Sequence, residues 1–204
     1  VIFAPHMKEQ QILDRKYISG IQQIGVGVKD FHEAWKWYIS NFGMDIRIFE
    51  EKAKAEYMLP HTNNQVWERH ACLAMNMQGG GGFEIWQHTE HTPVPPVFDI
   101  QMGDLGIYAG KIKSPNVKKA YEHLKDSASI LTPVEKDPKG RETFYLKDPF
   151  DNVWQIVEEH SMFMTKYRKP TGGSYGAVIG TSDPDKAREV YSDILGYDRV
   201  VYDE

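Results

Sequence analysis

A run of four glycines, Gly79 to Gly82, is the first feature of the sequence that suggests chemistry. Glycine-rich loops bind phosphate when a helix and a Lys-Ser or Lys-Thr pair follow, because backbone N–H groups and the lysine then face the anion. Neither feature follows here, and Gly82 instead opens a β-type run that ends at His88. The glycines therefore predict a tight turn between two strands rather than a phosphate site.

Histidines and one cysteine are the other candidates for ligands or catalytic groups. Of the 8 histidines, His70 and His88 lie on the strands expected to flank the glycine turn. A polar histidine at a strand end is usually an ordinary surface residue, so we retain only His88, as a candidate substrate contact at a pocket rim. The single cysteine, Cys72, excludes an internal disulfide framework and fits a reducing compartment, so we expect a cytoplasmic protein.

The composition argues against two classes of partner. With 24 Lys+Arg against 29 Asp+Glu, the net charge is -5 and no basic surplus exists to neutralise a nucleic acid backbone. No apolar run approaches the roughly 20 residues of a membrane helix. The length of 204 residues and the hydrophobic content of 41% are enough for one large domain or two small ones.

The elements that position these residues repeat three times along the chain. Each copy has an alternating strand, a helix-capping residue, a helix with an apolar stripe and, in the first and third copies, a glycine stop. The expected caps are Asp30 in the first copy and Ser114, followed by Pro115, in the second; the stops are Gly43 and Gly196. The first strands of the three copies are residues 21–28, 105–112 and 176–181.

Further strand candidates complete the first two copies, so each unit reads β-α-β-β-β. They are residues 45–49, 69–77 and 82–88 in the first unit and 130–134, 142–146 and 152–157 in the second. We place the first unit at 19–92, the second at 103–159 and the start of a third at 173–204, with the proline-rich residues 92–96 between the first two. The third unit breaks off after a second strand near Val200, which leaves an uncovered sheet edge. We therefore expect a longer protein with a fourth unit, or pairing of two chains in a homodimer.

Paired units with these signals resemble the vicinal oxygen chelate superfamily, which includes glyoxalase I, extradiol dioxygenases, bleomycin-resistance proteins and fosfomycin-resistance enzymes. The stretches that carry the resemblance are residues 23–30 (QIGVGVKD) running into Trp37 and Tyr38, residues 82–86 (GFEIW) and residues 144–155 (FYLKDPFDNVWQ). The last contains a strand, an Asp-Pro turn and a second strand, with Asp151 where the family usually has glycine. The resemblance implies an α+β fold of paired modules, which form a curved, pseudo-symmetric mixed sheet with helices on its convex face.

In that family the concave face holds a divalent metal, with ligands from the first and last strands of each unit. Carried over to this chain, the first unit supplies Gln23 and Glu84, and the second supplies Ile107 and Gln155. Ile107 offers no ligand atom, so only three candidate metal ligands remain: Gln23, Glu84 and Gln155. The ion would be Zn, Ni, Mn or Fe. The competing interpretation is that Gln23 and Glu84 hydrogen-bond each other or a neighbour.

Strand alternation divides the first unit into two faces. Glu84 shares its face with Trp86 and His88, whereas Phe83 and Ile85 point to the other face, under the helix. Trp86 and His88 are therefore candidate substrate contacts. The resemblance adds Ile107, at the family's ligand position in the second unit, and the aromatic Tyr145 is a further candidate. Trp154 is better explained by core packing, and Asp148 by hydrogen bonds to its own turn.

Two functions are compatible with these residues. The first is a small-molecule-binding protein with a degenerate metal site, whose concave pocket suits a small organic ligand. The second is a metal-dependent enzyme, either a glyoxalase I-like lyase in which Glu84 moves a proton or a dioxygenase-type enzyme. Metal analysis distinguishes the two functions.

Overall fold

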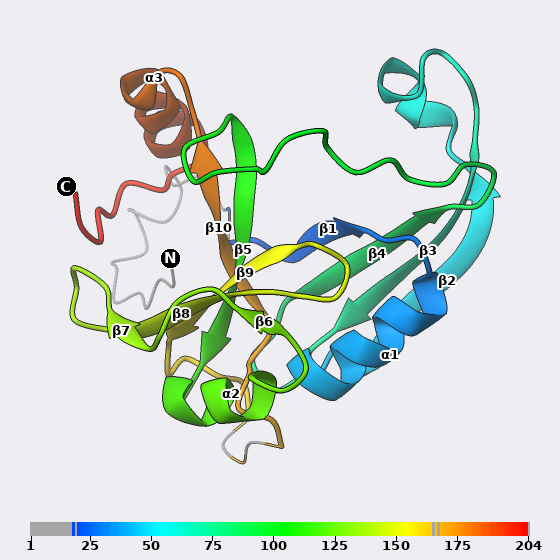
Figure 1. Ribbon diagram of the computed structural model, residues 1–204. Coiled ribbons are helices and arrows are strands. Elements are labelled where there is room, and N and C mark those ends of the chain that lie inside the picture. The colour runs from blue at the N-terminus through cyan, green and yellow to red at the C-terminus, as the bar shows by residue number, and fades with distance from the viewer. Residues whose placement is uncertain (1–17, 19, 165, 167, 204) are drawn as a thin grey trace, which may run out of the picture.

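The computed structural model describes residues 18, 20–164, 166 and 168–203, along which strands and helices alternate (Figure 1). The first unit contains β1 (Gln23–Gly27), α1 (Phe31–Phe42), β2 (Ile46–Lys54), the 3-10 helix η2 (Glu56–His61), β3 (Glu68–Met75) and β4 (Gly82–His88). The second contains β5 (Gly106–Ser114), α2 (Val117–Leu124), β6 (Ser129–Ile130), β7 (Glu135–Lys136), β8 (Glu142–Lys147) and β9 (Val153–Glu158). They are followed by β10 (Ser174–Gly180), α3 (Pro184–Glu189) and the π-helical turn η3 (Val190–Ile194).

The strands form two mixed sheets. Sheet A has the order β1-β4-β3-β2, and sheet B has the order β10-β5-β9-β8-β6, with β7 paired to β8. In each sheet the first strand of the unit runs parallel to the last, β1 beside β4 and β5 beside β9, and the other strands pair antiparallel. The α+β class and the mixed sheets expected from the sequence are therefore confirmed.

Helix α1 begins and ends where the sequence predicts. The Asp30 carboxylate accepts a hydrogen bond from the Glu33 N–H at 2.8 Å, and Gly43 closes the helix in the left-handed conformation with φ 69°. The apolar stripe of the helix is buried against sheet A through Phe31, Ala34, Tyr38 and Phe42. Figure 1 shows α1 and α2 lying on the outside of their sheets, as the family resemblance implies.

Helix α2 begins later than predicted, so the assignment of Ser114 as its cap was wrong. Asn116 is the N-cap, and its side chain accepts a hydrogen bond from the Lys119 N–H at 2.9 Å. Ser114 still belongs to β5, where it pairs with Glu158 of β9, and its hydroxyl donates to the Pro170 carbonyl at 2.6 Å. Because the strand ladder extends through Ser114, the helix can start only after the two residues that follow it.

One hydrophobic core joins both sheets through their helix-covered faces. The rings of Phe83 on β4 and Trp154 on β9 stack with their centroids 4.6 Å apart. Trp154 is 2% exposed, which confirms that it is a core residue. Burying one such side chain contributes roughly 1.5–3 kcal/mol, so this contact is a substantial part of what holds the two units together.

Asp148 is the polar centre of this junction. Its side chain accepts the N–H groups of Phe150 and Asn152 at 2.9 and 3.0 Å, so the predicted role in its own turn is confirmed. It also accepts the Tyr38 hydroxyl from α1 at 2.6 Å and the Trp154 indole N–H at 2.8 Å. Burial, together with the Asp148 charge, raises the pKa of Tyr38 well above its usual value, so Tyr38 remains a hydrogen-bond donor.

The glycine run forms the predicted turn between β3 and β4, and it also receives a distant segment. Gly80 and Gly81 have φ values of 79° and 77°, a conformation that favours glycine. A Cβ on Gly79 would come within 1.8 Å of the Gly172 carbonyl oxygen, so only glycine allows this approach. Beside it, the Gln78 side chain donates to the carbonyls of Lys169 and Thr171 at 2.7 and 2.9 Å. The chain between β9 and β10 is thereby attached to the first unit.

The segment that the sequence predicts to start a third repeat contains β10, which pairs antiparallel with the edge of β5, followed by α3 and η3. Gly196 has φ 74°, consistent with its predicted role as a stop. The second strand expected near Val200 is absent: residues 195–203 contain no strand. Within the described part of the chain, no helix has the length and apolar character that a membrane crossing needs.

Candidate functional site

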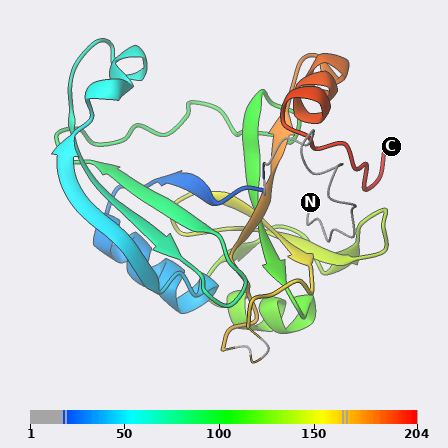
Figure 2. The same ribbon diagram turned by 180° about the vertical axis from the view of Figure 1, so that it is seen from behind.

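The uncovered face of sheet A brings together four of the site residues predicted from the sequence. Gly25 pairs with Glu84 and Gly27 with Trp86, and His88 follows at the end of β4. The intervening residues, such as Val26, Phe83 and Ile85, are buried beneath α1. In Figure 2, the strands of sheet A lie in front of α1, so the viewer looks onto this uncovered face.

Gln23 and Glu84 interact directly. The Gln23 amide Nε2 donates a hydrogen bond of 2.9 Å to Glu84 Oε2. The two strands bring these side chains together from positions 61 residues apart in the sequence. A partly buried carboxylate needs such a donor, because desolvation makes an unpaired charge costly.

Beside this pair, Gly25 and Gly27 of β1 leave open space above the strand, and we call this surface the glycine floor. A Cβ built on Gly25 or Gly27 would meet no atom within 4 Å. On the other side of Glu84, β3 and β2 supply Leu73 and Phe49 in register, so the adjoining surface is apolar. The face therefore combines one carboxylate, one amide, an apolar wall and an empty floor.

Arg69, which sequence reasoning missed, belongs to the same face. It lies opposite His88 in the β3–β4 ladder, and its guanidinium lies over the Trp86 ring, 4.7 Å from the centroid. Glu51 of β2 pairs with the other side of the guanidinium. Counting residues outward from the glycine turn would have placed Arg69 across from His88, since the two strands pair antiparallel.

The remaining site residues predicted from the sequence lie on sheet B, in the second unit. Gln155 is 5% exposed and donates to the Thr143 hydroxyl at 3.0 Å, while its Oε1 has no partner. Tyr145 pairs with Gln155 in register, and burial raises the pKa of its phenol to about 12. In the described part of the chain, no hydrogen bond, ion pair or ring contact joins these residues to Gln23, Glu84, Trp86 or His88.

The register of sheet B also corrects the counterpart of Gln23. Lys111 pairs with Gln155 as Gly25 pairs with Glu84, so Ala109 is the residue equivalent to Gln23. Ile107 lies two residues earlier, 66% exposed and beyond the β9 ladder. The shift follows from the wrong cap, because counting back from Asn116 instead of Ser114 leads to Ala109.

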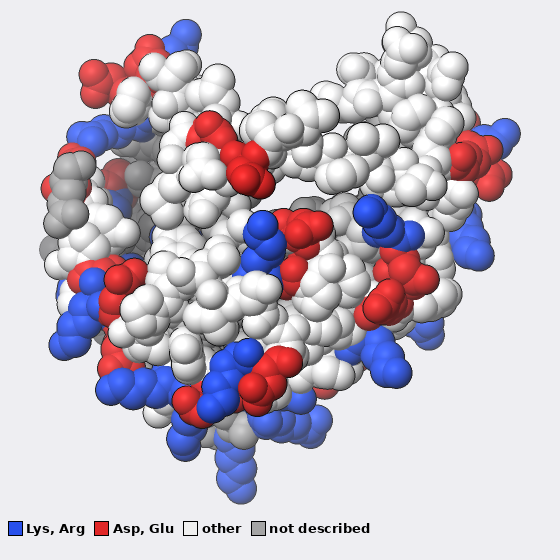
Figure 3. All heavy atoms as spheres, in the orientation of Figure 1, with Lys and Arg blue, Asp and Glu red and all other residues white. Residues whose placement is uncertain are grey.

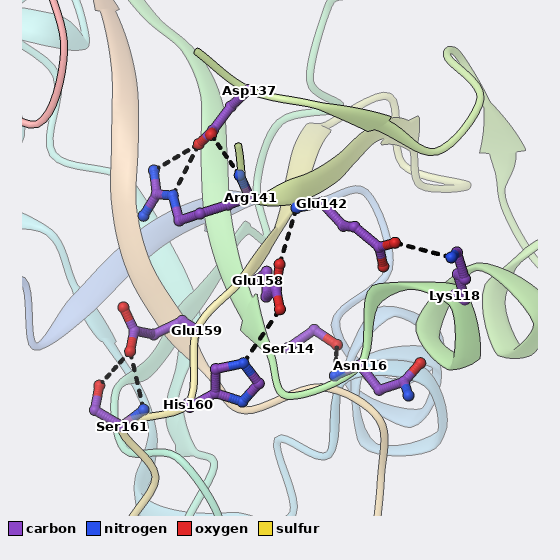
Figure 4. Close-up of polar contacts among 10 residues, drawn as sticks. All are labelled: Ser114, Asn116, Lys118, Asp137, Arg141, Glu142, Glu158, Glu159, His160 and Ser161. Atoms are coloured by element: carbon purple, nitrogen blue, oxygen red, sulfur yellow. Dashed lines mark hydrogen bonds and ion pairs between the residues drawn. The ribbon is translucent and has the colours of Figure 1, made fainter. Parts of the chain in front are cut away.

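Sheet B carries cations where sheet A has a glycine floor. Lys111 takes the place of Gly25, and burial, followed by the charge of Arg141, lowers the pKa of Lys111. Arg141 is held by Asp137 at 2.8 Å, and Glu158 accepts the Glu142 N–H at 3.0 Å (Figure 4). The first contact closes the β7–β8 hairpin, and the second joins β8 to the end of β9 on the face that carries Trp154 and Ile156, so both have a structural role.

A cleft of about 550 Å³ lies elsewhere, at the outer edge of sheet A. Two of its carboxylate contacts are internal pairs: Glu50 accepts from Arg47 at 2.8 Å and contacts His70 at 3.0 Å. Its lining is His32, Arg47, Glu50, Glu51, Lys52 and His70. A wall made only of such groups fits an organic ligand poorly, since small-molecule pockets are mostly apolar. We therefore place the candidate site on the uncovered face.

Comparison with known proteins agrees with this architecture. The model of the Glyoxalase/Bleomycin resistance protein/Dioxygenase superfamily matches residues 20–156, more than half of the chain. The chain belongs to this superfamily. The match includes β1 and β4, which carry Gln23 and Glu84, and most of β9, including Gln155. A search of curated proteins finds no match.

Solved structures with the superfamily fold are similar at low sequence identity. A glyoxalase family protein from Bacillus cereus has a TM-score of 0.57 at 10% identity, covering 72% of this chain and 97% of that one. A putative dioxygenase from Bacillus subtilis has a TM-score of 0.58 at 18% identity, covering 91% and 57%. A glyoxalase I mutant from Zea mays has a TM-score of 0.53 at 14% identity, covering 87% and 56%. The chain thus spans little more than half the length of the last two, and these similarities concern the fold alone.

The residues of this chain fit the superfamily's divalent metal poorly. Gln23 and Glu84 bring two side chains with oxygen ligands together, while Ala109 offers none and the Gln155 amide lies on sheet B, bonded to Thr143. Among the described residues, no group of three or more His, Cys, Asp or Glu side chains is placed to hold a metal ion. Two such side chains fall short of the usual protein donor set. We therefore derive no chemical step through a metal.

Proposed function

We propose that this protein binds a small organic molecule on the uncovered face of sheet A, at a metal site that has lost part of its ligand set. The supporting observation is the Gln23–Glu84 hydrogen bond beside two glycines with open space above them. The pair offers a carboxylate and an amide for polar recognition, and Phe49, which is 38% exposed beside the buried Leu73, offers apolar contact. Such a mixture suits a modest organic ligand.

Figure 3 shows the side of the molecule that carries α1 and α2, opposite the proposed site, and on this side few charged side chains lie in the upper right part, where η2 lies. Charged residues gather instead on the lower, helix-bearing half. We also propose a cytoplasmic location, because the single cysteine, Cys72, is a free thiol, which fits a reducing compartment.

Filling the floor tests the binding site. Gly27→Val adds a side chain above β1, where β-branched residues suit the strand. We expect ligand-observed NMR of the full chain to detect binding of phenyl fragments such as 3-phenylpropionate or its amide, and we expect Gly27→Val to abolish it. Gly176→Val is the matched control, because its Cβ would meet Lys111 only at ordinary contact distances of 3.5 and 3.9 Å. Equal binding by wild type and Gly27→Val would refute the site.

Metal analysis tests the alternative, a glyoxalase-like lyase or dioxygenase-type enzyme. We expect wild type and Glu84→Gln to contain equally little Zn, Ni, Mn or Fe after purification and dialysis. One tightly held metal per chain in the wild type, lost in Glu84→Gln, would favour the enzyme instead.

A further inference from the structure

Three nitrogen atoms without partners lie on the same face as the proposed site. In the described part of the chain, the buried side-chain polar atoms that lack a hydrogen bond are Arg69 Nη1, Trp86 Nε1, His88 Nδ1, Gln155 Oε1 and Ser174 Oγ. The first three come from adjoining positions on β3 and β4. Buried polar groups are nearly always paired, so such a concentration calls for an explanation.

The three side chains are close neighbours. Arg69 lies directly across from His88 in the ladder, and Trp86 precedes His88 by two residues on the same face. The guanidinium lies 4.7 Å above the Trp86 ring, and the rings of Trp86 and His88 are 5.9 Å apart. One small chemical group can therefore contact more than one of them.

The missing partner must accept hydrogen bonds. Arginine and tryptophan nitrogens only donate, and a histidine nitrogen donates in one tautomer. The nearby carboxylates are already engaged, since Glu51 binds the other side of the Arg69 guanidinium and Glu84 binds Gln23. A carboxylate has two oxygens and a negative charge, which suits a cluster of N–H groups with a guanidinium among them.

We propose that Arg69, Trp86 and His88 bind the carboxylate of a small aromatic acid whose ring lies over the glycine floor. The inference rests on the proposed function and names its ligand class. Two residues along a strand span about 7 Å, so the far end of such an acid lies beside Glu84 when its carboxylate is at Trp86. Because the guanidinium covers the indole, an anion that draws Arg69 aside also uncovers the indole N–H.

The experiment measures binding of benzoate, phenylacetate and 3-phenylpropionate, and of their uncharged amides, to the full chain by titration calorimetry. We expect at least one acid to bind at least about tenfold more tightly than its amide, because hydrogen bonds to charged groups are the stronger ones. Trp86→Phe keeps a ring but removes the N–H, and Arg69→Gln removes the charge. Each should weaken binding of the acid by about tenfold or more while leaving the amide nearly unchanged.

Matched controls separate this site from general effects. Arg47→Gln removes an arginine of the same sheet that pairs with Glu50, and Trp35→Phe removes an indole N–H on α1 that donates to the Met44 carbonyl. Neither should change the affinity for the acid. Equal affinities for acid and amide, absence of binding by all three acids, or Trp86→Phe and Arg69→Gln variants that bind the acid as the wild type does would each overturn the proposal.

The two proposals can fail separately. If the amides bind, Gly27→Val abolishes their binding and the acids show no advantage, the organic-ligand site stands and only the carboxylate subsite is wrong. If neither acids nor amides bind and Gly27→Val has no effect, both proposals are wrong.

Discussion

Sheets A and B repeat the same plan and use their two faces differently. On the helix-covered face, the equivalent residues remain large and apolar, as Phe83 and Ile85 of β4 correspond to Trp154 and Ile156 of β9. On the other face, the substitutions change the chemistry: Gln23, Gly25 and Glu84 in sheet A correspond to Ala109, Lys111 and Gln155 in sheet B. On the helix-covered face, packing allows only residues that fill the shared core. The other face has no such restriction, so its residues can differ in chemistry between the two sheets.

The turns before β4 and β9 extend the comparison. Asn76 and Asp148 both follow the penultimate strand, and each accepts two backbone N–H groups of its own turn. Asn76 also donates to the Phe42 carbonyl at 2.7 Å, whereas Asp148 accepts from Tyr38 and Trp154. The second turn therefore connects the helix of the first unit to the second unit, whereas the first connects a strand to its own helix and has a longer Asn76 contact of 3.5 Å with the Thr171 carbonyl.

The largest predicted effect is at this connection. Asp148→Ala should lower the free energy of unfolding by about 3–5 kcal/mol, because it leaves the Trp154 N–H and turn N–H groups buried without acceptors. Asn76→Ala should cost less, about 1–3 kcal/mol, since neutral hydrogen bonds contribute less. Urea denaturation of the two variants measures the difference. If Asn76→Ala lowered the free energy of unfolding more than Asp148→Ala does, the contacts of Asp148 between the two units would not be the larger contribution to stability.

The next prediction converts the floor of sheet A to that of sheet B. Gly25→Lys copies Lys111, and a Cβ at Gly25 meets nothing within 4 Å, so we expect the unfolding free energy to change by less than about 1 kcal/mol. The added side chain occupies the floor, so affinity for both the phenyl acids and their amides should fall at least about tenfold. Calorimetric titration and urea denaturation check the two parts. Unchanged affinity would place the ligand elsewhere.

The third prediction concerns Lys111, which has on sheet B the position that Gly25 has on sheet A. Burial, followed by the Arg141 charge, lowers the pKa of Lys111, so the charged form destabilises the folded state at neutral pH. This penalty decreases as pH rises through the folded pKa and is absent above the usual value of 10.5. Lys111→Met should therefore stabilise the protein by up to about 1 kcal/mol at pH 7 and by less at pH 10. Urea denaturation of Lys111→Met at both pH values measures this gain, with Lys119→Met as an exposed control. A larger gain at pH 10 would contradict the sign.

The smallest predicted effect compares one carboxylate from each sheet. The Arg47 hydrogen bond, and then His70, lower the pKa of Glu50 on sheet A; the Glu142 backbone N–H is the main cause for Glu158 on sheet B. Both groups stabilise the fold above the usual pKa of 4.5, and this contribution is lost as pH falls through their lower folded pKa values. Solvent screening limits each contribution to less than about 1 kcal/mol. Denaturation at pH 7 and pH 3 should show a smaller acid loss in Glu50→Gln and Glu158→Gln than in wild type.

The sequence predicted the fold well because the local signals for strands, helix caps and helix ends agreed with the order of elements in the whole fold. Alternating strands, the Asp30 cap and the Gly43 stop each match an element of the structure. The Ser114 cap failed because serine suits both a strand end and a cap, and only the ladder with Glu158 shows which role it has. That error moved the counterpart of Gln23 from Ala109 to Ile107.

The sequence predicted which residues of one strand share the site face, but it did not predict the charged residues that neighbouring strands add to that face. Alternation placed Glu84, Trp86 and His88 on one face, and the structure brings Gln23 to Glu84. Arg69 and Glu51 escaped notice because their importance depends on pairing with distant residues. A charged residue on a strand resembles any solvated one until its neighbours across the sheet are known.

The attachment of the β9–β10 segment to the glycine turn has a consequence for the order of folding. The Gln78 side chain accepts the N–H groups of Arg168 and Lys169, and a Cβ on Gly173 would come within 2.2 Å of the Gly80 carbonyl oxygen. Strand β10 starts directly after this contact, so its register on β5 depends on a turn about 90 residues earlier in the chain. Native-state hydrogen exchange should therefore show the β10 amides opening together with the turn of the first unit, as one cooperative group. Strand β10 would then acquire its position only after the turn between β3 and β4 has formed.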